Sequence, residues 1–89
     1  MTETIINVSP AFIKAAEIRL AKRDYGGIAE YFPFGNKSFV QMIHVKTKRL
    51  VNLTKSLQPP QNESIEDNLI DLINYASYYY EWLKGELHE

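Results

Sequence analysis

Two carboxylates four residues apart are the clearest candidates for chemistry in this chain of 89 residues. Asp67 and Asp71 lie in the longest periodic segment, which runs from Glu63 to Lys84, and residues four apart share one face of a helix. Such a pair could hold Mg²⁺, a hard ion that prefers oxygen ligands. Asp67 also has a structural interpretation, because Ser64 precedes it by three residues, as in the capping box of a helix start. The spacing therefore predicts either a metal site or a capped helix.

Basic residues of the preceding helical segment could bind a phosphate group. Lys46 projects from the apolar face of a helix predicted at about residues 38–57, and Arg49 follows at the edge of that face. Lysine supplies a point charge and arginine a planar fork, so the two could form an anion site. Two other interpretations of Lys46 stay open: a salt bridge to an acidic residue, or a buried aliphatic stem whose ammonium reaches water.

Aromatic residues mark the loop of residues 26–37, which glycine and proline interrupt. Tyr31, Phe32 and Phe34 are unusual in a solvated loop, so the sequence predicts that they hold the loop against the core. They could instead stack on a planar ligand, in which case Tyr31 or the preceding Tyr25 would contact a nucleobase.

Three helices must position these residues. A Ser-Pro pair is typical of a helix start and Gly-Gly of a helix end, which predicts a first helix at about residues 10–25. A short connector with a Pro-Pro pair separates the helix at 38–57 from a third helix at about residues 64–84, so these two long helices should be antiparallel neighbours. The sequence thus predicts an all-α fold, a small three-helix bundle in a single domain of residues 1–89.

The last predicted helix divides into two opposed stripes at 3.6 residues per turn. The apolar stripe is the predicted core, whereas the polar stripe could be a solvated surface, a functional surface or an interface with a second subunit. The predicted core stripe consists of Ile65, Leu69, Leu72, Ile73, Ala76, Tyr79, Tyr80 and Leu83. The opposite stripe consists of Asp67, Asp71, Asn74 and Tyr78.

Composition limits the classes of protein that fit. The chain has no cysteine and only two histidines, which excludes disulfides and a structural zinc site. A chain of this length buries only roughly 60–65% of its unfolded surface, so we expect a homo-oligomer to complete the bundle. No signal-peptide pattern and no apolar run of about 18 residues is present, so the sequence predicts a cytoplasmic protein.

Charge is divided unequally along the chain. Residues 1–57 carry nine Lys/Arg and four Asp/Glu (+5), and residues 58–89 carry one Lys and seven Asp/Glu (−6), which add to −1. The division predicts a basic helix packed beside an acidic one, or a basic pocket for a phosphate group. The slightly negative total, with basic residues spread around the second helix, argues against duplex nucleic acid as a partner.

Three sequence elements occur in order along the chain. They are Lys22-Arg23-Asp24-Tyr25-Gly26, then Lys46-Thr47-Lys48-Arg49-Leu50-Val51-Asn52-Leu53, then the stretch from Glu63 to Ala76. Together they resemble the nucleotide modification associated domain 1 family of small bacterial and phage proteins. One departure is Val45, which stands where the family tends to have Asp, so an acid–lysine pair is lost. The resemblance implies a link to nucleotides in phage biology. It also implies a functional role for ten residues: Asp24, Tyr25, Gly26, Lys46, Arg49, Asn52, Asp67, Asp71, Asn74 and Tyr75.

The residues and the family resemblance together suggest three hypotheses for function. In the first, a non-enzymatic phage protein binds a nucleotide or cyclic nucleotide signal and sequesters it as an anti-defence protein. In the second, a Mg²⁺-dependent nucleotide-processing enzyme uses the candidate metal ligands Asp67 and Asp71. In the third, this chain is a protein–protein interaction or inhibitor protein that contacts its partner through the aromatic run from Tyr78 to Trp82. The first is favoured, with no catalytic residue assigned, because the second helix carries no Asp or Glu to complete a metal site. Its predicted ligand-binding residues are Arg23, Asp24, Tyr25, Gly26, Lys46, Arg49, Asn52, Asn74 and Tyr75.

Overall fold

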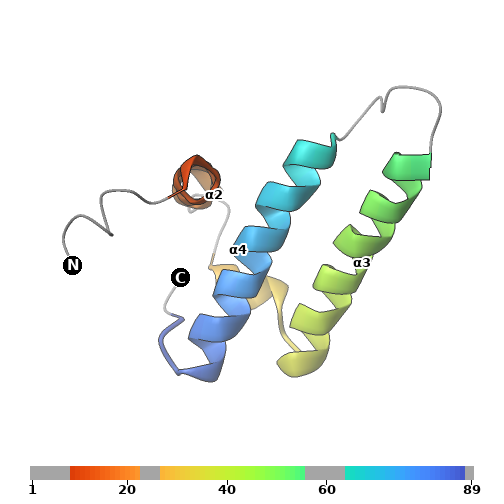
Figure 1. Cartoon of the computed structure of the whole chain (residues 1–89). Coiled ribbons are helices and arrows are strands. Elements are labelled where there is room, and N and C mark those ends of the chain that lie inside the picture. Colours follow the sequence, from red (N-terminus) through yellow and green to blue (C-terminus); the bar gives the residue numbers. More distant parts are fainter. Residues whose placement is uncertain (1–8, 23–26, 56–63, 88–89) are drawn as a thin grey trace.

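The described part of the chain is entirely helical apart from turns and connections (Figure 1). A computed structural model describes residues 9–22, 27–55 and 64–87. The elements are α2 (Pro10–Ala21), the 3₁₀ helix η2 (Ile28–Tyr31), α3 (Asn36–Lys55) and α4 (Ile65–Leu83), and these ranges contain no strand. The prediction of an all-α fold with three helices is confirmed.

Helix α4 is the central element of the bundle. It packs against α3 and against α2. Figure 1 shows α3 and α4 side by side and antiparallel, as predicted, with α2 seen nearly end-on beside α4. Since α4 contacts a helix on each of two sides, its side chains divide among three surfaces: one toward α3, one toward α2, and one toward neither.

The ends of the helices follow local sequence signals. Ser64 Oγ accepts a hydrogen bond from Asp67 N (3.0 Å), and Ser64 N donates to Asp67 Oδ2 (3.3 Å), so the capping box predicted for α4 is confirmed. Helix α2 ends at Ala21 with Lys22 as its C-cap, which is earlier than the predicted end at residue 25. The glycine closure predicted there lies outside the described residues.

Aromatic rings form most of the core between α3 and α4. Phe39 is fully buried, and its ring stacks on Phe32 (4.3 Å between centroids) and on Tyr79 (5.0 Å). Ile28 of η2 and Tyr78 of α4 complete the buried cluster. Stacked rings bury large areas from few residues, which suits a chain this short.

The prediction for the loop aromatics is right only for Phe32. Phe32 is buried, whereas the side chains of Tyr31 and Phe34 are exposed. The 3₁₀ turn of η2 explains the difference, because it places Ile28 and Phe32 against the core and leaves Tyr31 outward. The segment is therefore held by one aromatic residue and one aliphatic residue.

The core stripe predicted for α4 is wrong. Five of its residues are exposed and none is buried: the exposed members are Ile65, Leu69, Ala76, Tyr80 and Leu83. The buried residues of α4 are instead Asn68, Asn74 and Tyr78. Each amide nitrogen donates a hydrogen bond, Asn68 Nδ2 to Ser64 O (2.9 Å) and Asn74 Nδ2 to Ala15 O (3.0 Å), and the ring of Tyr78 packs in the aromatic core.

Candidate functional site

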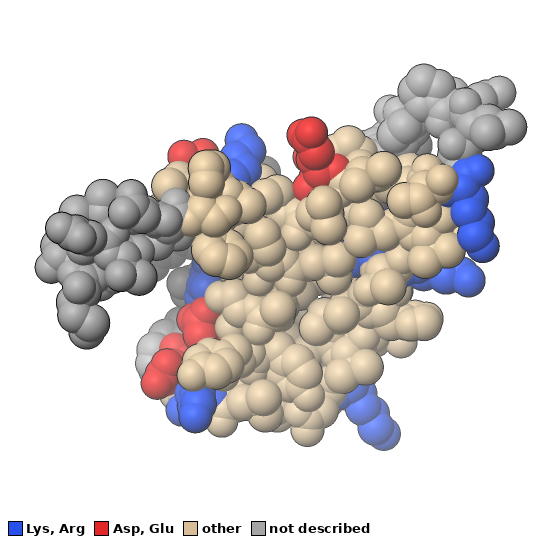
Figure 2. Space-filling view, in the orientation of Figure 1, with Lys and Arg blue, Asp and Glu red and all other residues tan. Residues whose placement is uncertain are grey.

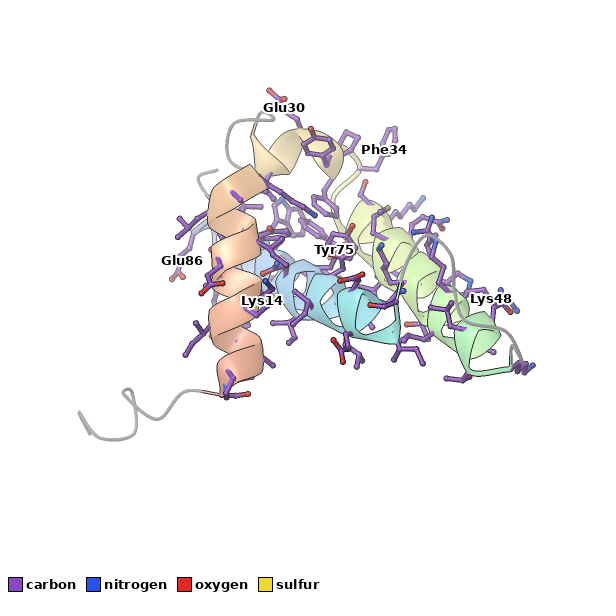
Figure 3. The ribbon with its side chains drawn as sticks, turned by 90° about the horizontal axis from the view of Figure 1, so that it is seen from above. Lys14, Glu30, Phe34, Lys48, Tyr75 and Glu86 are labelled. Carbon is purple, nitrogen blue, oxygen red and sulfur yellow. The ribbon has the colours of Figure 1, made fainter. Side chains whose placement is uncertain are left out.

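A cavity of about 360 Å³ lies where the end of α2, η2, α3 and α4 meet. Its walls are largely aromatic, and its polar groups gather on α2 and α4. The lining residues are Lys22, Ile28, Tyr31, Phe32, Met42, Asp71, Asn74, Tyr75 and Tyr78. Figure 3 labels Tyr75 in the middle of the molecule, between α3 and α4. This size and this lining of apolar walls with a few polar groups are typical of small-molecule sites.

Asp71 forms the charged end of the cavity. Lys46 Nζ lies 2.8 Å from Asp71 Oδ2, and Lys22 Nζ lies 3.8 Å from Asp71 Oδ1. Lys46 is only 6% exposed, so the salt-bridge interpretation of this residue holds and the snorkelling interpretation does not. Two ammonium groups thus face one carboxylate, and the ammonium of Lys22 is the more exposed of the two.

Two tyrosines of α4 form a fixed aromatic wall. Tyr75 meets the ring of Phe32 edge to face, with 5.9 Å between centroids. Tyr78 is buried, and the guanidinium of Arg19 lies 4.7 Å from its ring centroid. Ring contacts of this kind restrict side-chain rotation, so the wall is held in place before any ligand arrives.

An ion pair on the far side of Tyr78 holds α2 across α4. Arg19 donates from Nη1 to Glu81 Oε2 (2.7 Å) and from Nη2 to Glu81 Oε1 (2.9 Å), and Ser77 Oγ donates to Glu81 Oε2 (3.1 Å). The hydrogen bonds from Arg19 lower the pKa of Glu81, although partial burial opposes them. Together with the bond from Asn74 to Ala15, this pair fixes Lys22 at the end of α2 beside the cavity.

A family model for nucleotide modification associated domain 1 matches residues 21–78, which is well over half of the chain. The chain belongs to the nucleotide modification associated domain 1 family. The matched range contains every residue that lines the cavity, from Lys22 to Tyr78. A search of curated proteins and a search of solved structures each found no match.

The residues predicted for the site fall into four groups. Lys46, Asp71, Asn74 and Tyr75 come together at the cavity, with Lys46 reaching it through Asp71. Arg49 and Asn52 have exposed side chains further along α3 and do not line the cavity. Asp67 lies one turn before Asp71, in the capping box. The remaining four, Arg23, Asp24, Tyr25 and Gly26, lie outside the described residues.

Several lining residues carried weak or no sequence signal as ligand contacts. Lys22 opens the first family element and Tyr78 belongs to the polar stripe of α4, so both could have been found. Ile28, Phe32 and Met42 are apolar, and only the packing of η2 and α3 brings them to the cavity.

The Mg²⁺ site at Asp67 and Asp71 stays a prediction. Asp67 accepts a hydrogen bond from the backbone of Ser64, and Asp71 is paired with lysines. Within residues 9–22, 27–55 and 64–87, no group of three or more His, Asp or Glu side chains could hold a metal ion. A Mg²⁺ ion bound there would therefore depend on oxygen atoms from a ligand, such as phosphate oxygens.

Proposed function

We propose that this protein binds a nucleotide or a nucleotide-derived signal, with the base in the cavity between η2, α3 and α4. The observation that carries the proposal is the combination of aromatic walls with Lys22, Asp71 and Asn74 at one end of a cavity of about 360 Å³. A nucleobase has a flat apolar face and a polar edge. Rings can stack on the face, and a carboxylate or an amide can hydrogen-bond to the edge.

The phosphate groups of the ligand would meet Lys22. Its side chain is half-exposed at the mouth of the cavity, whereas the charge of Lys46 is balanced by Asp71 at 2.8 Å. The family elements put Arg23 directly after Lys22 in the sequence, so a second cation could act beside it. The proposed phosphate contact is thus Lys22 at the end of α2, instead of Lys46 and Arg49 on α3 as the sequence suggested.

Binding without turnover fits the arrangement best. Asp71 is the one carboxylate among the described residues that line the cavity, and it is already paired with Lys46 at 2.8 Å, so a second acid or base for catalysis is missing there. The family description supports a link to nucleotides. The proposal includes a phage origin, a homo-oligomeric state and a role in the host cytoplasm, where the protein would hold a nucleotide or cyclic nucleotide away from a defence receptor.

A thermal-shift panel tests the proposal. Nucleoside mono- and triphosphates and cyclic dinucleotides are added with and without Mg²⁺, and each ligand that shifts the transition is re-examined for intact recovery. A ligand at 100 times its dissociation constant should add about 2.7 kcal/mol to the free energy of unfolding. Stabilisation with the ligand recovered intact is the expected result.

Matched aromatic variants locate the site. Both side chains are largely exposed, and Tyr31 (59% exposed) lines the cavity whereas Phe34 (78% exposed) does not. Tyr31→Ala should weaken binding at least 5-fold, since stacking of a base contributes about 1–3 kcal/mol, and Phe34→Ala should leave it unchanged. Lys22→Ala should weaken the binding of phosphorylated ligands and leave the binding of the nucleoside unchanged.

The same experiment decides between the alternatives. Turnover that requires Mg²⁺ and is lost in Asp67→Asn and Asp71→Asn would make the protein a nucleotide-processing enzyme. No shift across the panel would refute nucleotide binding for those ligands and would favour the protein–protein interaction or inhibitor hypothesis.

A further inference from the structure

Helix α4 exposes an aliphatic and aromatic stripe along its full length. The stripe, named the outer stripe, consists of Ile65, Leu69, Leu72, Ala76, Tyr80 and Leu83. Successive members are three or four residues apart, which is the spacing of a seam between two packed helices. Leu69 is 48% exposed and Tyr80 and Leu83 are each 61% exposed, although hydropathy alone would place all three in a core. Neither α2 nor α3 covers this stripe.

The outer stripe continues onto α2 through a shallow groove. The groove has a volume of about 440 Å³ and is lined in part by Phe12, Ala16, Ile73 and Ala76. Phe12 is exposed at its edge. Figure 2 shows residues other than Lys, Arg, Asp and Glu over most of the face that it presents, with the charged ones mainly toward its edges. An exposed apolar patch such as the outer stripe is typical of an interface between proteins.

We propose that a second copy of this chain packs its own outer stripe against this one, with the two α4 helices antiparallel about a two-fold axis. Charge selects the antiparallel direction. Glu66 lies in the first turn of α4, and Lys84 caps its end. They are 18 residues apart, or five turns, so they lie on the same flank of the stripe. Antiparallel packing brings Glu66 beside Lys84 of the partner subunit, and it places the two helix dipoles in opposite directions, which is favourable. Parallel packing would instead bring the two acidic first turns together.

The side chains of the outer stripe complement one another in this arrangement. With Ile65 opposite Leu83 of the partner subunit, the two-fold axis passes near residue 74. Leu72 then faces Ala76 of the partner subunit, so that a large side chain meets a small one. Leu69 comes level with Tyr80 of the partner subunit. The outer stripe is thus self-complementary in size as well as in charge.

The dimer does not depend on the nucleotide-binding proposal. The residues of α4 that line the cavity, namely Asp71, Asn74, Tyr75 and Tyr78, lie on the other side of the helix. The dimer would leave the cavity open. It would also hold α4 in place, the helix that carries most of the polar groups of the cavity. Failure of nucleotide binding would therefore leave the dimer intact, and failure of the dimer would refute only the homo-oligomeric part of the proposed function.

Light scattering after gel filtration, over a range of protein concentrations, tests the interface. The wild type should have twice the 10.3 kDa mass of one chain, and Leu69→Glu should return the mass to one chain. The matched control is Val40→Glu, because Val40 is 54% exposed on α3 and Leu69 is 48% exposed on α4. The control should stay dimeric. Far-UV circular dichroism verifies that both variants keep their helices.

Other masses overturn the proposal. A wild type that is monomeric at every concentration would refute it, as would a Leu69→Glu variant that stays dimeric. A chain without residues 2–8 should remain a dimer. If that deletion converts a monomeric wild type into a dimer, the occupant of the outer stripe is the N-terminal segment of the same chain, and the proposal is also refuted.

Engineered cysteines test the direction of the helices, since the chain has none of its own. Under mild oxidation, the double variant Ile65→Cys/Leu83→Cys should form a covalent dimer, and each single variant should not. Cross-linking by the single variants would indicate parallel helices and overturn the antiparallel arrangement. Absence of cross-linking in all three variants would overturn it as well.

Discussion

The salt bridge between Lys46 and Asp71 gives the most direct test of how α3 and α4 are joined. Asp71→Asn keeps the shape of the side chain but removes the charge that faces the ammonium of Lys46 at 2.8 Å. Breaking a buried ion pair by removing one partner costs about 3–5 kcal/mol. The Asp71 side chain is 18% exposed, so we expect the low end of this range, about 3 kcal/mol.

This loss is large for a chain of 89 residues. In a domain of this size, each kcal/mol shifts the melting temperature by about 4–8 °C, so Asp71→Asn should melt about 12–24 °C below the wild type. Urea unfolding followed by circular dichroism, and by the fluorescence of the single tryptophan, gives the free energy directly. Protein concentration is held fixed, because an oligomer melts at a concentration-dependent temperature.

The control is Glu66→Gln, the same loss of charge in the exposed first turn of α4. Its expected effect is about 1 kcal/mol or less, since an exposed carboxylate loses only its interaction with the helix dipole and, in the proposed dimer, with Lys84 of the partner subunit. The double variant Lys46→Gln/Asp71→Asn should be more stable than Asp71→Asn, because it removes the buried ammonium as well. If Asp71→Asn lowers stability no more than Glu66→Gln does, the pair is effectively solvated and the reasoning fails.

Three further predictions concern local features. Acid should destabilise the wild type more than it destabilises Glu81→Gln. The hydrogen bonds from Arg19 lower the pKa of Glu81 from its ordinary 4.5, so the stabilisation by this ion pair is complete above pH 4.5 and is lost as the pH falls through the lowered pKa. Unfolding free energies measured against pH test this. Ser64→Ala should cost about 1 kcal/mol in urea unfolding, because α4 loses its capping hydroxyl. Gly35→Ala should lower the melting temperature more than Gly85→Ala, since both glycines have positive φ (62° and 71°) but only at Gly35 would a Cβ lie 3.1 Å from the Trp82 ring.

Each of these has a definite contrary result. Parallel pH profiles for the wild type and Glu81→Gln would show that the carboxylate titrates alike in the folded and unfolded states. An unchanged urea midpoint in Ser64→Ala would mean that water replaces the cap. Equal melting temperatures for the two glycine variants would mean that the indole shifts at no cost.

The sequence alone determined the number of helices and the capped starts of α2 and α4, because helix starts depend on neighbouring residues. Ser64 and Asp67 predict the start of α4 from a spacing of three residues, and the structure has the same pair of hydrogen bonds. The short connector similarly predicts that α3 and α4 are antiparallel, and they are. Family motifs in the sequence also named Lys46, Asp71, Asn74 and Tyr75, which come together at the cavity.

Only the tertiary structure decided which surface of α4 is buried. Periodicity assigns residues to the same or opposite sides of a helix, but it does not say where the neighbouring helices lie. Helix α4 has two neighbours, and the inner positions at Asn74 and Tyr78 need hydrogen bonds and ring contacts as well as burial. An aliphatic stripe was therefore left outside, against the rule that the most apolar side faces the core.

The contacts of Lys46 at the candidate site also depended on how the helices pack. The sequence offered a salt bridge, snorkelling or a phosphate contact for Lys46, and local information could not choose among them. The choice depends on which acidic residue the packing of α3 on α4 brings to the ammonium, and that residue is Asp71, far along the chain. Local interactions thus determined where the helices begin and what they carry, and long-range packing decided which side chains meet, because a contact between helices depends on their orientation as well as on their sequence.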